Sequence, residues 1–138
     1  MSEPDKKLKF KMAKADYLFE YRPESNKLIW TSPESFSDVV KPPAMWNMKS
    51  LSDLRTKMRG RKEIDPLFVD IEPKYCSITQ HEGRHRAKVA SELGIEEVPV
   101  LIYCRNKERG YVDYSECRPC EYVFEKWKWK RERNRKKP

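Results

Sequence analysis

Six consecutive residues, His81 to Arg86 (HEGRHR), combine one carboxylate, one glycine, two imidazoles and two guanidinium groups. A glycine allows the backbone to approach a ligand closely. A helix that starts at this point would offer unpaired N–H groups and the positive end of its dipole to an anion, for which phosphate is the natural guest. The basic side chains after the glycine would add further donors. The predicted phosphate-binding residues are Gly83, Arg84, His85 and Arg86.

The same run contains two side chains that could transfer protons. Cleavage of a phosphodiester needs a base for water and an acid for the leaving oxygen, and Glu82 and His85 are the catalytic candidates. A divalent metal such as Mg²⁺ or Mn²⁺ would need a second carboxylate, which Asp70 or Glu72 could supply by position alone. His81 is as consistent with a solvent-exposed or hydrogen-bonded histidine as with a functional one.

A purely structural alternative is an ion pair between Glu82 and Arg86, one helical turn apart, with Arg84 and His85 facing water. Such pairs contribute only about 0.2 to 0.5 kcal/mol. They explain neither Gly83 nor the clustering of basic groups at the end of a helix where the dipole disfavours cations. We therefore favour an anionic partner for this cluster.

The motif must be positioned by the strands and helices around it. Residues 67–71 and 75–79 are predicted as strands, and the apolar spacing over residues 83–93 predicts a helix. Residues 98–103 follow as a strand in which Pro99 belongs near the start or on an edge. Strand, helix and strand with short connections predict an α+β (α/β) fold, a small mixed sheet flanked by helices.

Two helices are expected before these strands. Ser32, followed by proline, predicts a short helix through Val40. A pattern like a capping box at Ser50 predicts a second helix from about residue 51 to residue 59, which Gly60 would stop. The residues before 28 are polar with little periodicity and predict a partly ordered lead-in.

The net charge of +8 is concentrated at the end of the chain. Residues 126–138 hold eight Lys or Arg and one Glu, a net charge of +7. This block predicts an arm for DNA, because cations bind phosphates and indoles stack on exposed bases. As an alternative, its tryptophans anchor a final helix over residues 119–129 to the core. The alternation of tryptophan and lysine fits an extended segment equally well. The predicted nucleic-acid-binding residues are Lys126, Trp127, Lys128, Trp129, Lys130, Arg131, Arg133 and Arg135.

The lack of a membrane span and of a secretion signal predicts a cytoplasmic protein, in a host cell if a virus encodes it. No apolar run approaches the ~20 residues that cross a bilayer, and the first residues are too charged for a secretion signal. Without such a signal we expect free thiols. Cys117 and Cys120 have the spacing of a zinc knuckle but lack a second pair, so structural zinc is not expected. A disulfide between them, or from one of them to Cys104, would fit only a hyperthermophile source.

The motif resembles the ParB/sulfiredoxin-like superfamily. The resemblance is carried by residues 78–87 (ITQHEGRHRA), by Leu93-Gly94-Ile95 and by Val98-Pro99-Val100, and it covers roughly residues 50–104. It implies a lead-in over residues 1–49, a core over 50–104 and an extension over 105–138. It also implies that Gly83, Arg84, His85 and Arg86 bind nucleotide phosphates and that Glu82 is the acidic residue that serves as base or orients a metal.

The branches of this superfamily predict different activities. Sulfiredoxins need a nucleophilic Cys directly before the His-Arg pair, and Arg84 at that position cannot supply a thiolate. Too few residues follow Cys104 for the helix-turn-helix module of the partition proteins. A short domain with a basic end resembles the ParB-like nucleases of phages, plasmids and archaeal mobile elements. We therefore expect a DNA-acting phosphodiester hydrolase. The alternatives are a non-catalytic module that binds DNA or nucleotide, and a kinase that uses a nucleoside triphosphate.

Overall fold

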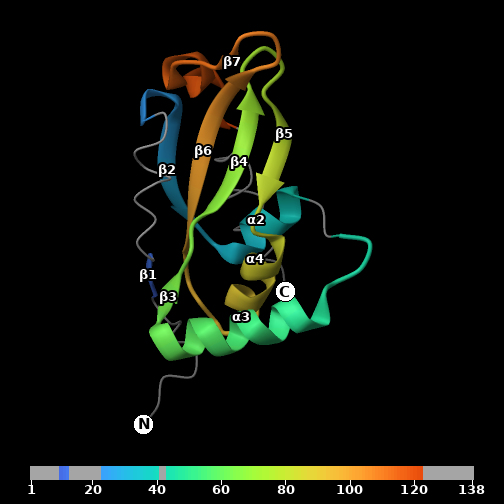
Figure 1. Ribbon diagram of the computed structural model, residues 1–138. Helices are drawn as coiled ribbons and strands as arrows, with labels where there is room; N and C mark the ends of the chain where they lie inside the picture. Colours follow the sequence, from blue (N-terminus) through green and yellow to red (C-terminus); the bar gives the residue numbers. More distant parts are fainter. Residues whose placement is uncertain (1–9, 13–22, 41–42, 123–138) are drawn as a thin grey trace, which may run out of the picture.

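The computed structural model describes residues 10–12, 23–40 and 43–122, and its centre is a five-stranded sheet (Figure 1). The strand order is β2-β6-β4-β5, and β7 pairs with β6. β4 and β6 are parallel, and the other pairs are antiparallel. The strands are β2 (Asn26–Thr31), β4 (Leu67–Glu72), β5 (Ser77–Glu82), β6 (Val98–Asn106) and β7 (Gly110–Tyr111). The predicted α+β class with a mixed sheet is confirmed.

Within the described residues, three α-helices accompany the sheet. They are α2 (Pro33–Val39), α3 (Met48–Arg61) and α4 (Arg84–Glu92). Figure 1 shows α2 and α4 beside the lower half of the strands, while α3 crosses below them. A parallel ladder joins β1 (Lys11–Met12) to β3 (Glu63–Ile64), and two 3₁₀ helices, η1 (Pro23–Ser25) and η2 (Tyr114–Cys120), complete the described elements.

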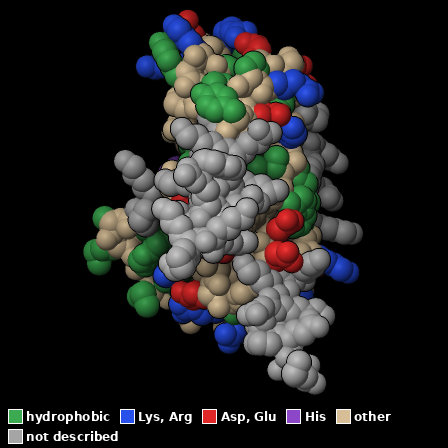
Figure 2. Space-filling view, turned by 180° about the vertical axis from the view of Figure 1, so that it is seen from behind, with side chains coloured by type: hydrophobic (Ala, Val, Ile, Leu, Met, Phe, Trp, Pro, Cys, Tyr) green, Lys and Arg blue, Asp and Glu red, His purple; other side chains and the backbone are tan. Residues whose placement is uncertain are grey.

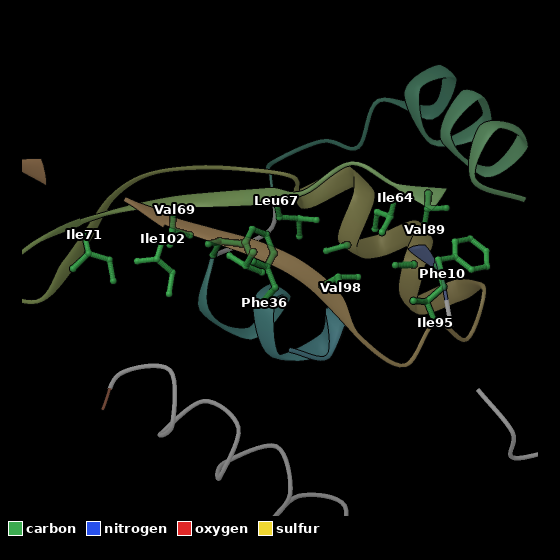
Figure 3. Packing of buried hydrophobic residues seen from close by; sticks show 14 of the residues in the cluster. Phe10, Phe36, Ile64, Leu67, Val69, Ile71, Val89, Ile95, Val98 and Ile102 are labelled. Atoms are coloured by element: carbon green, nitrogen blue, oxygen red, sulfur yellow. The ribbon is translucent and has the colours of Figure 1, made fainter. Parts of the chain in front are cut away.

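The core lies between the sheet and the helices. β6 is buried at every position from Val98 to Cys104 and pairs with β2 on one edge and β4 on the other. Figure 3 shows Val69 and Ile102 of the sheet close to Phe36 of α2. Pro99 is near the start of β6, as predicted, where the pairing with β4 has not begun, since that register starts at Val100. Its missing N–H is therefore tolerated.

The helices begin and end by identifiable caps. Ser32 caps α2 by accepting a hydrogen bond from the Ser35 N–H (3.1 Å), which confirms that helix. α3 starts earlier than predicted, because the Asn47 side chain accepts the Ser50 N–H (2.9 Å) and caps the helix itself. α3 also continues through Gly60 to Arg61, so the predicted stop is wrong. A glycine in an exposed helix costs only about 1 kcal/mol, which the neighbouring turns can offset.

Two strands depend on partners that a local pattern does not reveal. β5 begins at Ser77 and extends to Glu82, so the prediction over residues 75–79 is displaced; pairing with β4 from Glu72↔Ser77 to Phe68↔Glu82 sets its limits. Cys76 lies in the preceding turn at φ 52°. β2, which falls in the predicted lead-in, pairs with β6 along its whole length.

Two disulfides fasten η2 to the upper end of the sheet. Cys76 pairs with Cys120 and Cys104 with Cys117, with Cα–Cα distances of 5.2 and 5.8 Å. The expectation of free thiols is therefore wrong, because η2 brings both of its cysteines to partners that are distant in sequence. The bridges argue against a reducing cytoplasm. Cys117 and Cys120, considered above as zinc ligands, each form one of these disulfides.

The structure tests only part of the remaining expectations, which concern localisation and the basic arm. Within the described ranges, no helix is both long and apolar enough to cross a membrane. η2 ends at Cys120, and the predicted arm, with Trp127 and Trp129, lies outside the described residues. Gly110 is at φ 83° at the start of β7.

Removing the bridges should destabilise the fold in the order of the loops they close. The Cys76–Cys120 and Cys104–Cys117 pairs span sequence separations of 44 and 13 residues. By loop entropy, the double alanine variant of the first pair should lose about 4 kcal/mol and that of the second about 3 kcal/mol. Urea unfolding without reductant measures both losses. Equal stability of wild type in the presence and absence of dithiothreitol would contradict the bridges.

Candidate phosphate site at the start of α4

Gly83 forms the turn from β5 into α4. It is the N-cap residue of α4, at φ 119° and ψ 13°, a region that residues with a side chain rarely adopt. A Cβ atom at this position would lie 2.4 Å from Cγ of Leu67 and 2.9 Å from its Cβ. Leu67 is fully buried at the start of β4. Close packing against Leu67 therefore requires a glycine at position 83, in addition to the close approach of a ligand that we expected from the sequence.

The first turn of α4 presents positive charge. Gly83 has no side chain that could cap the helix, and the first turn contains no acidic residue. The turn is closed by the Ala87 N–H, which donates to the Gly83 carbonyl (2.8 Å). The preceding N–H groups belong to Arg84, His85 and Arg86, as the sequence predicted. This arrangement is the ordinary basis of anion binding at a helix start.

The Arg86 side chain points back to the sheet. It donates to the Pro66 carbonyl (3.0 Å), and a guanidinium nitrogen lies 3.6 Å from a Glu82 carboxylate oxygen. Its side chain is only 17% exposed. The ion pair that we considered as a structural alternative is therefore present. Arg86 joins the start of α4 to the start of β4, so its replacement would affect the fold as well as any ligand.

His85 points toward the loop between α2 and α3. Its Nε2 accepts the Asn47 N–H (3.1 Å), and Trp46 packs edge-on against the imidazole with 5.1 Å between ring centroids. An Nε2 atom that accepts carries no proton, so in the neutral ring the proton is on Nδ1. His85 could act as a base at Nε2 only by releasing Asn47.

Arg84 points in a third direction, into a pocket between α2 and α4. The pocket has a volume of about 320 Å³. Basic groups line it on the α4 side, where Lys88 lies one turn beyond Arg84 with its Nζ 5.1 Å from the Trp46 ring centroid. Acidic groups line the opposite wall and the far end. The complete lining is Glu34, Ser37, Asp38, Val40, Trp46, Arg84, Lys88, Ser91 and Glu92.

The predicted carboxylates have different surroundings. Glu82 is 62% exposed at the end of β5. Glu72 accepts the backbone N–H groups of Lys74 (2.9 Å) and Lys107 (2.7 Å), which gives it a structural role. The Asp70 carboxylate is buried, has no hydrogen-bond partner among the described residues, and has a pKa raised by burial. In the described ranges, no three His, Cys, Asp or Glu residues are placed to hold a metal ion.

His81 faces the helices from β5, opposite Val69. It is half-buried, and its Nδ1 has no hydrogen-bond partner in the described part of the chain. Burial lowers the pKa of the imidazole, and the nearby charge of Arg84 lowers it further. His81 is therefore a neutral neighbour of the motif at pH 7.

Sequence reasoning missed the residues that complete this site from elsewhere. Asn47 and His85 are 38 positions apart in the chain, and no local pattern links them. Lys88 could have been predicted from the sequence, because it lies one helical turn after Arg84. Met45 and Met48, on either side of Trp46, are 84% and 68% exposed, and Figure 2 shows hydrophobic side chains on the protruding loop at its left edge.

Comparison with solved structures gives a structural likeness. No protein-family model matches the chain, and no curated protein matches it. A solved structure described as a Pnob8-like ParB-N domain is similar with a TM-score of 0.39 and 19% sequence identity. The match covers 75% of this chain and 37% of that chain, so this chain spans little more than a third of its neighbour.

Replacing Gly83 by alanine should destabilise the fold by about 2 to 4 kcal/mol, since a left-handed residue and an overpacked core each cost about 1 to 3 kcal/mol. Gly94→Ala is the matched control, because Gly94 also has a positive φ (76°) but nothing lies within 4 Å of an added Cβ. Chemical denaturation measures both variants. Equal losses would show that contact with Leu67 is unimportant.

The lowered pKa of His81 predicts acid sensitivity. A histidine whose folded pKa lies below the unfolded value of about 6.5 contributes no penalty above that pH, and destabilises the fold as the pH falls below it. The free energy of unfolding should therefore drop between pH 7.5 and pH 5.5 by more in wild type than in His81→Gln. Parallel pH profiles for the two proteins would refute this assignment.

Proposed function

We propose that the chain binds a phosphate-bearing ligand, a nucleotide or nucleic acid, at the start of α4, and that it hydrolyses phosphodiester bonds of DNA. One observation carries the proposal. The first turn of α4 is capped by Gly83 alone, lacks acidic residues and begins with Arg84, which lines a pocket together with Lys88. An anion there would be stabilised by the helix dipole, by N–H groups and by side-chain cations together.

The three basic residues have different roles in this proposal. Arg84 contacts the ligand through its side chain, because it lines the pocket. His85 and Arg86 contribute backbone N–H groups, while their side chains hold the turn against Asn47 and Pro66. A turn held in this way keeps its donors aligned before the anion arrives, which reduces the cost of binding.

In the hydrolytic reaction Glu82 is the base. It is exposed and directly precedes the phosphate-binding turn, so it can take a proton from the water whose oxygen attacks the bound phosphorus. The bond from phosphorus to one DNA sugar oxygen then breaks, and that leaving oxygen takes a proton from solvent water. The Arg86 guanidinium lies 3.6 Å from the Glu82 carboxylate. The positive first turn would stabilise the charge that develops on the phosphate oxygens.

The second candidate is a binding module without turnover. Two observations favour it: the Nε2 lone pair of His85 accepts the Asn47 N–H, and the Glu82 carboxylate interacts with Arg86. Both catalytic candidates then have positioning roles, and DNA phosphate would occupy the same turn unchanged. In either case the predicted arm, Lys126 to Arg135, would hold the rest of the nucleic acid by counterion release.

Incubation with supercoiled plasmid and binding of fluorescent DNA separate these functions. Arg84→Gln should weaken binding about tenfold to a hundredfold, the scale of a lost charge-assisted hydrogen bond. Arg118→Gln, an equal change of charge on η2, should not. Glu82→Gln should abolish nicking while binding persists.

Each outcome has one interpretation. Binding with no nicking by wild type, with or without Mg²⁺ or Mn²⁺, would establish the binding module and reject the hydrolase. Nicking that survives Glu82→Gln would exclude Glu82 as the base. Equal affinities of the Arg84→Gln and Arg118→Gln proteins, both with native melting temperatures, would reject the phosphate site.

A further inference from the structure

A strongly basic surface lies on α3, outside the phosphate site. The helix contains five Lys or Arg and one Asp. Arg55 is paired with Glu92 (2.8 Å) and Lys57 with Asp65 (3.4 Å). The other three cations, Lys49, Arg59 and Arg61, are exposed and form no ion pair in the described part of the chain. Figure 2 shows Lys and Arg side chains at the lower edge of the molecule, at the height of α3.

Helix stabilisation accounts for only part of this pattern. Arg59 and Arg61 are in the last turn, where cations interact favourably with the helix dipole. Lys49 is in the first turn, where a cation is unfavourable and where α3 has no acidic residue. The start of α3 adjoins the start of α4 through the hydrogen bond from Asn47 to His85. Two helix starts, each with a basic first turn, therefore meet at this place.

We propose that α3 is a second nucleic-acid contact, at which Lys49, Arg59 and Arg61 bind phosphates of duplex DNA. Lys49 and Arg61 are separated by about 18 Å along the helix, at 1.5 Å per residue. That length corresponds to about five base-pair steps of 3.4 Å. This contact and the proposed function involve the same class of ligand. Binding of DNA at α3 does not depend on phosphate binding at α4.

The charge of the whole chain favours DNA over an acidic protein as the partner. The last thirteen residues carry a net charge of +7, so the chain has two strongly basic segments. One extended polyanion can occupy both at once, and such bivalent binding raises the affinity beyond that of either segment. An acidic protein that binds α3 instead is an outcome of the test below.

The test compares two triple variants of the full chain. Lys49→Gln/Arg59→Gln/Arg61→Gln removes the α3 cations. Lys74→Gln/Lys107→Gln/Arg118→Gln removes the same charge from exposed positions at the opposite end of the molecule. Affinity for a 20-base-pair duplex is measured from 50 to 300 mM KCl, together with melting temperature.

The α3 variant should bind at least tenfold more weakly at low salt. The slope of log K against log[salt] should fall by about 2 to 3, because three phosphate contacts are lost at about 0.9 each. The control should retain the wild-type slope. Equal slopes for the two variants, both folded, would overturn the proposal and leave α3 available to an acidic protein. A reduced slope in the α3 variant with no effect of Arg84→Gln would support α3 and reject the phosphate site.

Discussion

The close approach of Gly83 to Leu67 sets the geometry of the motif. An added Cβ would collide with the Leu67 side chain, and the positive φ of Gly83 turns the chain from β5 into α4 at that point. Leu67 is itself fixed, because β4 pairs with β6 from Leu67↔Val100 onward. The orientation of α4 therefore derives from the sheet. Arg86 reinforces it by donating to the carbonyl of Pro66, the residue before Leu67.

This orientation distributes three consecutive basic residues around the helix, because successive side chains are about 100° apart. Arg86 returns to the sheet, His85 meets the α2–α3 loop and Arg84 enters the pocket. Of three basic side chains that are adjacent in the sequence, one therefore lines the pocket and two are hydrogen-bonded to neighbouring elements. The N–H groups of the first turn remain together, and they are the feature that a phosphate would use.

The sequence predicts those elements whose signals are local. Three elements were predicted from such signals: β6 from its apolar run, α4 from the spacing of its apolar residues and α2 from the Ser32 cap. β5 is mostly polar, and its pairing with β4 defines its length, so composition placed it too early. The disulfides depend on η2, which brings Cys117 and Cys120 to Cys104 and Cys76. The motif was found from residue types, but the contact of His85 with Asn47 arises only when α3 packs on α4.

The central claim is that the first turn of α4 binds phosphate, and backbone amide shifts measure this directly. A ¹⁵N-labelled full-length chain is titrated with inorganic phosphate, with chloride at equal ionic strength as the reference. The account predicts saturable shifts of the Arg84, His85 and Arg86 amides, reduced in Arg84→Gln. Shifts that are confined to α3 or to residues beyond 122, with the α4 amides unmoved, would contradict it.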